Sequence, residues 1–321
     1  MGLRFVLSCA RIEAMLTYLQ AIILGVFQGV TELFPVSSLG HSVLLANLFG
    51  WHNLSGQETA DASSFLNLLV MMHVATAIAL IIFYRQQWIR IVKGFFHSID
   101  IRKKRVNFTA SSDSKLAWLL AAATVPAALI GLIFEHPLRA MFATAFFAII
   151  FITINGIILI KGDKLVVAAE LARPRRRGQS DEMAVEATAV IVSKKLTFER
   201  AVLIGCAQIG ALFAGISRSG ITMIAGLRSG LGHQDAARFS FLLATPIILG
   251  AGIYKLPSVL SADNGTMGPI LVGSILSGIG AYMSVRFLDK YFQGRSLKPF
   301  GWYCIGFGIL MLLISIIRGS S

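Results

Sequence analysis

The sequence predicts an all-α, polytopic membrane protein built from two inverted repeats, with about six spanning helices and two re-entrant helical hairpins. Three observations lead to this fold class. The 321 residues are 55% hydrophobic and only 14% charged, which is too apolar for an ordinary water-soluble domain. Apolar stretches long enough to cross about 30 Å of hydrocarbon recur along the chain. Lysines and arginines gather between these stretches in an alternating pattern.

Six apolar segments are predicted to span the membrane as helices, because backbone groups inside hydrocarbon must be satisfied within each segment. They are residues 65–84, 116–134, 141–160, 239–260, 267–288 and 300–317. Two further apolar regions, 15–50 and 201–231, are interrupted by polar residues, glycines or proline. Such interruptions are typical of broken helices, so we expect both regions to form re-entrant hairpins.

The connections between the segments indicate the topology. Residues 85–115 hold eight lysines and arginines, residues 164–200 hold another eight, and residues 286–298 hold four. Residues 51–64 and 261–268 hold none. Because cytoplasmic loops are enriched in these residues, the first hairpin is predicted to enter from outside and the second from the cytoplasm. The net charge of +13 is therefore interpreted as a topology signal, and a nucleic-acid partner is not expected.

The chain is predicted to divide into a first repeat (1–162), a cytoplasmic linker (163–196) and a second repeat (197–321). An offset of 180 residues superposes identical residues of the two hairpins, namely Ala21, Gly25, Gln28, Ser37 and Gly40 on Ala201, Gly205, Gln208, Ser217 and Gly220. The linker carries an arginine cluster followed by acidic residues, so we expect it to be solvated, with the arginines near anionic lipid head groups. Inverted repeats would bring the turns of the two hairpins face to face.

The first hairpin concentrates polar groups that are costly inside hydrocarbon, at about 3 kcal/mol for an ionisable residue. Gln28 and Glu32 are four residues apart and share one helical face. Pro35 ends that helix. Three polar residues follow the proline: Ser37, Ser38 and His41.

The second hairpin carries one guanidinium, Arg218, among hydroxyl side chains and glycines. Backbone amides, hydroxyls and an arginine suit a phosphate group. The candidate phosphate-binding hydroxyls are Ser217, Ser219 and Thr222. A structural interpretation stays open for each serine, because small polar residues in membrane helices mostly serve close packing. We leave His73 outside the site as a packed, hydrogen-bonded residue of a spanning helix.

The two hairpins resemble the signature regions of the undecaprenyl-diphosphate phosphatase family, also called the bacitracin-resistance type. Its first motif, Glu or Gln, three residues, Glu, then Pro-Val-Ser-Ser and Gly-His, is matched from Gln28 to His41. Its second motif, Pro-Gly-x-Ser-Arg-Ser-Gly-x-Thr, is matched up to Thr222, with Ala214 in place of the proline. Phe34 also departs from the usual leucine. The similarity covers nearly the whole chain, including residues 239–246.

The resemblance implies an enzyme that hydrolyses undecaprenyl diphosphate to undecaprenyl phosphate and inorganic phosphate, and so recycles the lipid carrier for cell-wall synthesis. It implies the bacterial inner membrane as location, with the active site open towards the outer side. Magnesium or calcium is the expected cofactor, with Glu32 and Gln28 as its protein ligands. A homodimer is left open.

The resemblance and the chemistry together assign roles. Arg218 would clamp the diphosphate, and Glu32 would act as general base or hold the cation. Either Ser38 or His41 would be the nucleophile while the other assists proton transfer, and the sequence does not choose between them. The expected substrate contacts are Gln28, Ser37, Ser217, Ser219 and Thr222.

The main alternative is a transporter that flips a polyprenyl phosphate, because inverted repeats with facing broken helices are typical of that class. Hydroxyl and imidazole groups beside the Glu32 carboxylate favour catalysis over pure transport. A phosphatidic-acid-type phosphatase is rejected, because Ile224 occupies the position of a required histidine. A structural scaffold would leave the buried charges unexplained.

Overall fold

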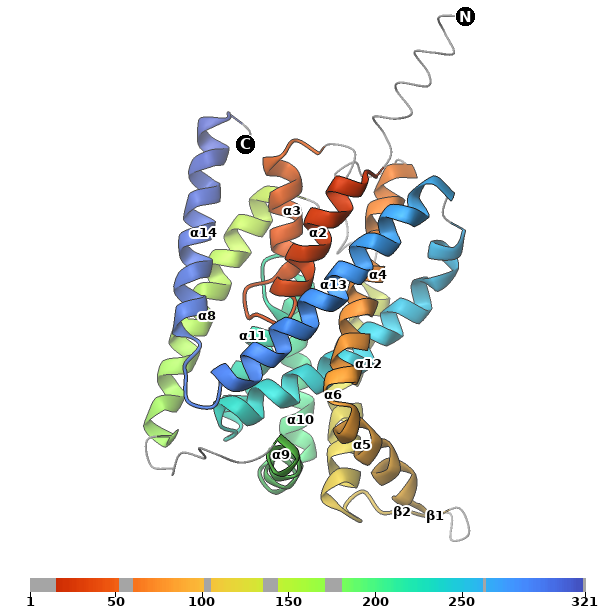
Figure 1. The fold of residues 1–321 in the computed structure, drawn as a ribbon. Coiled ribbons are helices and arrows are strands. Elements are labelled where there is room, and N and C mark those ends of the chain that lie inside the picture. Colours follow the sequence, from red (N-terminus) through yellow and green to blue (C-terminus); the bar gives the residue numbers. More distant parts are fainter. Residues whose placement is uncertain are drawn as a thin grey trace, which may run out of the picture.

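The computed structural model describes residues 16–51, 60–100, 105–134, 144–170, 181–261 and 264–319. These residues are almost entirely helical, which confirms the all-α fold class (Figure 1). A short antiparallel pair of strands, β1 (Ile99–Asp100) and β2 (Arg105–Val106), pairs Ile99 with Val106.

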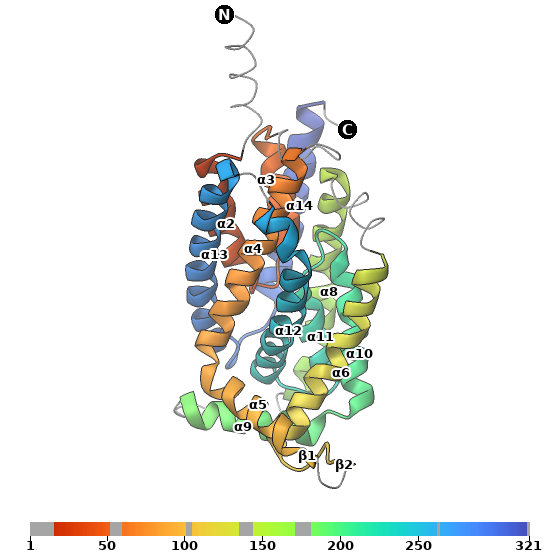
Figure 2. The ribbon, with the colours of Figure 1, turned by 90° about the vertical axis from the view of Figure 1, so that its right-hand side faces the viewer.

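Six helices are long and apolar enough to cross a membrane, as the sequence predicts. They are α4 (Ala60–Phe83), α6 (Ser112–Ile133), α8 (Ala145–Glu170), α12 (His233–Leu260), α13 (Asn264–Tyr291) and α14 (Lys298–Ile317). Two shorter helices, α5 (Arg85–His97) and α9 (Asp181–Lys195), lie at the lower end of the bundle in Figure 1. Figure 2 shows α4 and α12 in the middle of the molecule, where they pack against each other.

Both predicted hairpins are present, and each is a helix pair broken by a turn. The first consists of α2 (Tyr18–Thr31) and α3 (Ser38–Leu48). The second consists of α10 (Phe198–Ile209), the 3₁₀ turn η2 (Gly210–Leu212) and α11 (Arg218–Arg228). In Figure 1 the first hairpin enters the bundle at the upper end, where α14 ends, and the second at the lower end, beside α9.

The offset of 180 residues holds in the structure as well as in the sequence. Thr17 caps the start of α2 through its hydroxyl, and Thr197 caps α10 in the same way. Ser37 and Ser217 likewise cap α3 and α11. The helices of the two hairpins therefore begin at equivalent positions after the shift, which identifies the hairpins as repeats of one structural unit.

Each hairpin is covered by a helix from the other half of the chain. The helix α13 packs along α2, and α6 packs along α10. A Cβ atom added at Gly25 would overlap the backbone of Gly273, and one added at Gly205 would overlap the backbone of Ala123. Because Gly25 and Gly205 are equivalent positions, the two halves interlock by the same close backbone contact.

The two largest differences between predicted and observed helix boundaries lie where buried polar residues are satisfied. The helix α12 begins at His233, six residues earlier than the apolar pattern, since Arg238 forms a paired contact with Asp289 at 2.6 and 2.7 Å. The helix α8 continues to Glu170, past the predicted repeat boundary at 162. Asp163 is buried inside it, where the carboxylate bonds to His233 Nε2 at 2.7 Å and accepts the amide of Leu297 at 3.0 Å.

The expectation of a solvated linker is wrong for its second part. The helix α9 packs against α6 and α12, and Ala189 and Val192 are buried. Lys115 on α6 donates to the carbonyl of Ser193 at 2.5 Å. The apolar positions of α9 therefore dock the linker onto the bundle. The arginine cluster lies outside the described residues, and the division into 1–162, 163–196 and 197–321 stays a prediction.

Candidate active site

The turns of the two hairpins touch each other. The hydroxyl of Ser37 accepts the amide of Gly215, in the second turn, at 3.1 Å, and also the amide of Gly40 at 3.3 Å. A Cβ at Gly40 would lie 2.9 Å from the Cα of Gly215, so only glycine allows this approach. Ser37 has a φ of 72°, a backbone conformation that a side chain rarely adopts and that these hydrogen bonds hold in place.

One buried amide on α8 joins both turns. The Nδ2 of Asn155 donates to the carbonyl of Pro35 at 3.0 Å, and its Oδ1 accepts the amide of Ser217 at 3.0 Å. Asn155 is fully buried. The motifs of the sequence do not point to this residue, although a lone amide in an apolar span is itself a signal, because it needs buried partners.

Glu32, which follows the last residue of α2, is the centre of the polar cluster. Its Oε1 accepts from Arg218 Nη2 at 2.7 Å. Its Oε2 accepts from the Ser38 hydroxyl at 2.5 Å and from Gln28 Nε2 at 2.9 Å. The structure thus brings together four of the predicted residues, which come from both hairpins. The Glu32 and Ser38 side chains are buried, and the Arg218 side chain is 16% exposed.

His73 on α4 also belongs to this cluster, so its exclusion was wrong. Its Nε2 lies 3.2 Å from Glu32 Oε2 and 3.0 Å from Gln28 Nε2. Its Nδ1 lies 2.6 Å from the carbonyl of Leu69, which can only accept, so Nδ1 carries a hydrogen. The other ring nitrogen of His73, Nε2, is the one that faces the Glu32 carboxylate. The signal that could have found His73 is an ionisable residue in an otherwise apolar span.

His41 points away from the carboxylate. Its Nδ1 donates to the carbonyl of Ser37 at 2.7 Å, and its Nε2 lies 2.9 Å from the Tyr303 hydroxyl on α14. Its ring stacks on Phe307, with centroids 4.5 Å apart. Among the described residues, His41 has no hydrogen bond to Glu32. The first turn of α3 directs position 38 towards Glu32 and position 41 towards α14.

The predicted phosphate-binding hydroxyls of the second turn mostly hold the turn together. The Ser217 hydroxyl accepts the amide of Gly220 at 3.1 Å and lies 3.0 Å from the Ser219 hydroxyl. The Ser219 hydroxyl donates to the carbonyl of Phe34 at 3.2 Å. The Thr222 hydroxyl donates to the carbonyl of Arg218 at 2.7 Å. These contacts fix Arg218 at the first position of α11, opposite the first hairpin.

The two predicted cation ligands, Gln28 and Glu32, offer oxygen atoms of the kind that magnesium and calcium take. Gln28 Oε1 is buried and has no hydrogen-bond partner among the described residues, so it is free to accept one. Glu32 contributes the neighbouring carboxylate, although its oxygens already accept from Arg218 and Ser38. In the described part of the chain, no group of three His, Cys, Asp or Glu side chains could hold a metal. Two oxygens fit magnesium, which usually keeps waters and binds substrate phosphates.

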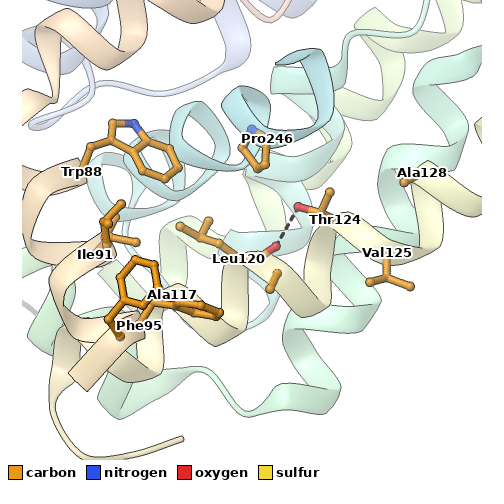
Figure 3. A pocket seen from close by; sticks show the side chains of 12 residues that line it. Trp88, Ile91, Phe95, Ala117, Leu120, Thr124, Val125, Ala128 and Pro246 are labelled. Atoms are coloured by element: carbon orange, nitrogen blue, oxygen red, sulfur yellow. Dashed lines mark hydrogen bonds between the residues drawn. The ribbon is translucent and has the colours of Figure 1, made fainter. Parts of the chain in front are cut away.

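Two apolar grooves lie elsewhere in the described part of the chain. One has a volume of about 420 Å³ and lies between α5, α6 and Pro246 of α12 (Figure 3). Figure 3 shows Trp88, Ile91 and Phe95 facing Leu120 across it. The other, of about 490 Å³, lies between α4 and α13. No charged side chain lines either groove, so neither is suited to phosphate chemistry.

The fold and the cluster define a polytopic membrane protein whose two broken-helix hairpins assemble one charged, hydroxyl-bearing site. A family profile described as "Bacitracin resistance protein BacA" matches residues 21–310, so the chain belongs to this family. An "Undecaprenyl-diphosphatase 2" of Frankia alni is 42% identical, covering 92% of this chain and 97% of that protein. An "Undecaprenyl-diphosphatase" of Mycolicibacterium paratuberculosis is 47% identical (91% and 95%). An "Undecaprenyl-diphosphatase 2" of Burkholderia thailandensis is 41% identical (91% and 94%).

Proposed function

We propose that the protein is an integral membrane phosphatase that hydrolyses undecaprenyl diphosphate to undecaprenyl phosphate and inorganic phosphate. The contact that carries this proposal is the hydrogen bond of 2.5 Å from the Ser38 hydroxyl to Glu32, whose other oxygen is held by Arg218 at 2.7 Å. The Ser38 hydroxyl and the phosphate-binding guanidinium of Arg218 thus each lie within hydrogen-bond distance of one carboxylate base, Glu32. The names of the relatives support the same substrate.

Ser38 is the nucleophile in this proposal, and His41 is not. The Ser38 hydroxyl already donates to a carboxylate that can take its proton. Both ring nitrogens of His41 have partners, in Ser37 and Tyr303, away from Glu32. His41 instead supports the position of α3 against α14.

The two turns supply the groups that bind the negatively charged diphosphate of the substrate. The helices α3 and α11 both begin there, so their first amide groups and the positive ends of their dipoles converge on one region. The guanidinium of Arg218 uses one nitrogen on Glu32, which leaves others for phosphate oxygens. Anion binding therefore needs no contribution from Ser217, Ser219 or Thr222 beyond holding the turn.

The reaction has two steps. The Ser38 oxygen forms a bond to the terminal phosphorus, its proton passes to Glu32, and the bridging P–O bond breaks to release undecaprenyl phosphate. Water then attacks the phosphoserine and the P–O bond to Ser38 breaks. The proton held by Glu32 returns to the Ser38 oxygen, and inorganic phosphate leaves as H₂PO₄⁻ with both protons of the water. Arg218 offsets the charge that builds on the equatorial oxygens in both steps.

Magnesium or calcium would be held by Gln28 Oε1 and Glu32. The cation would neutralise phosphate charge when bound. The protein's own part is to present two oxygens, one of them without any other partner among the described residues.

The multi-pass membrane location rests on the six spanning helices. We infer from the family membership that the membrane is the bacterial inner membrane and that the site opens towards its outer side. The basic loops follow the positive-inside pattern, which places α9 in the cytoplasm. The product is then the monophosphate carrier for cell-wall synthesis. No contact among the described residues favours the transporter alternative.

Hydrolysis is tested with the purified protein in detergent, a C15 or C55 prenyl diphosphate and magnesium or calcium. Phosphate release well above that of an Arg218→Ala variant is expected. Wild-type release no greater than that of the variant would contradict the proposed function.

A further inference from the structure

Phe34 connects the catalytic turn to the outside of the helix bundle. Its backbone faces the second turn, since its carbonyl accepts from the Ser219 hydroxyl at 3.2 Å. Its ring points the other way and stacks on Phe287 of α13, with centroids 5.9 Å apart and planes 12° apart. It also meets the edge of Phe300 on α14 at 5.6 Å. One residue of the turn thus lies between two spanning helices.

The two helices beside Phe34 pack on different neighbours. The helix α14 lies along α8, whereas α13 lies along α2 and α4. Figure 1 shows the turn between α2 and α3 in the space that separates α14 from α13. The ring contacts of Phe34 bridge this space, and Phe287 is 53% exposed. An aromatic surface therefore runs from the turn to the membrane side of the bundle.

A polyprenyl diphosphate needs such a surface. Its phosphates must reach Ser38 and Arg218, while its chain must stay among apolar groups from the first isoprene unit onwards. Neither of the two apolar grooves described above is lined by a residue of the turns, so the prenyl chain of a bound substrate cannot begin there. Phe34 is two residues from Glu32 and offers an aromatic face at the required place.

We propose that Phe34, Phe287 and Phe300 form the surface on which the first isoprene units of the substrate pack, and that the chain leaves the site between α13 and α14. The proposal rests on the function proposed above and adds the binding site of the chain. Aromatic rings suit this partner because they bury a large area at a low entropy cost.

The test compares chain lengths. Phe34→Ala and Phe287→Ala are expected to lower kcat/KM for a C15 prenyl diphosphate about tenfold relative to kcat/KM for the C5 compound, chiefly through KM. Phe34→Leu should keep most of the C15 preference, since leucine remains apolar. Trp302→Ala is the matched control: Trp302 lies on α14, is 64% exposed and takes part in none of the ring contacts described.

An equal loss for C5 and C15, or no loss for either, would overturn the proposal. Phe287→Ala decides the matter if Phe34→Ala does not fold, because Phe287 is on another helix and half exposed. A non-hydrolysable C15 methylene-diphosphonate, titrated calorimetrically, separates the two proposals. Wild-type binding that the variants weaken, without hydrolysis of any diphosphate, contradicts the enzyme and keeps the chain site. Hydrolysis by the wild type, together with unchanged binding of the analogue by the variants, contradicts the chain site and keeps the enzyme.

Discussion

Arg218 and Glu32 are 186 residues apart in the chain, yet the Nη2 of Arg218 donates to Oε1 of Glu32 at 2.7 Å. The contact joins the two hairpins, and it exists because both turns reach the same region from opposite ends of the bundle (Figure 1). A buried carboxylate beside a guanidinium is stable as a charged pair, whereas either group alone would be costly there. The internal repeat is therefore what permits the site.

Removing the guanidinium should weaken catalysis more than it weakens binding of the prenyl chain. Arg218→Lys keeps the charge but loses the fork of donors, so we expect kcat to fall by about 10²-fold. Steady-state phosphate release from the C15 substrate measures this. Arg200→Lys is a suitable control, because Arg200 is exposed and its side chain donates to the backbone carbonyls of Lys195 and Ser229, away from the turns. A kcat for Arg218→Lys close to wild type would show that the bidentate geometry is unimportant.

The choice of nucleophile predicts a clear difference between two neighbouring positions. Ser38→Ala should reduce turnover by at least about 10³-fold, since it removes the attacking oxygen. His41→Gln should cost about tenfold or less, because the amide can keep contacts to the Ser37 carbonyl or Tyr303. Rapid acid quenching followed by mass spectrometry should find phosphate on Ser38 in the wild type. Phosphohistidine at position 41 would reverse the assignment.

Cation dependence should respond to Gln28. Chelation with EDTA is expected to stop phosphate release, and added magnesium or calcium should restore it. Gln28→Glu adds a second carboxylate beside Glu32 and should lower the cation concentration that gives half-maximal activity. Titration of activity against free cation checks this. Full activity of the chelated wild type, or an unchanged cation requirement in Gln28→Glu, would remove the metal from the proposed function.

The interlocking of the two halves predicts a stability effect at equivalent glycines. Gly25→Ala and Gly205→Ala place a Cβ against the backbone of Gly273 and Ala123, so each should destabilise the fold by about 1–3 kcal/mol. Gly306→Ala on α14 is the matched control, because a Cβ atom added there meets no described atom within 4 Å. Thermal unfolding in detergent reports the difference. Equal melting temperatures for all three variants would argue against the close helix contact.

Much of the fold could be predicted because the signals are local. Apolar runs and basic loops define the six spans, and the repeated pattern of Gln28 and Ser37 at Gln208 and Ser217 defines the hairpins. The docking of α9 could not be predicted from the sequence, because the burial of Val192 depends on surfaces that α6 and α12 form only after folding.

The site could be predicted in part. The clustering of Glu32, Ser38 and Arg218 follows from two polar turns that face each other. His73 and Asn155 were missed, since each is a single polar residue in an apolar span and sequence spacing does not link it to the turns. The role of His41 stays a prediction: its motif is in the hairpin, and in the structure its Nε2 lies beside the Tyr303 hydroxyl.

In the proposed function, the two turns act as one catalytic unit on a prenyl diphosphate. The most direct measurement is kcat/KM for phosphate release from undecaprenyl diphosphate by the wild type, Glu32→Gln, Arg218→Gln and the double variant. We predict that each single substitution removes most of the activity and that the double variant is little worse than either, because residues of one unit are not additive. Independent, multiplicative losses, or a wild type no faster than the double variant, would contradict the claim.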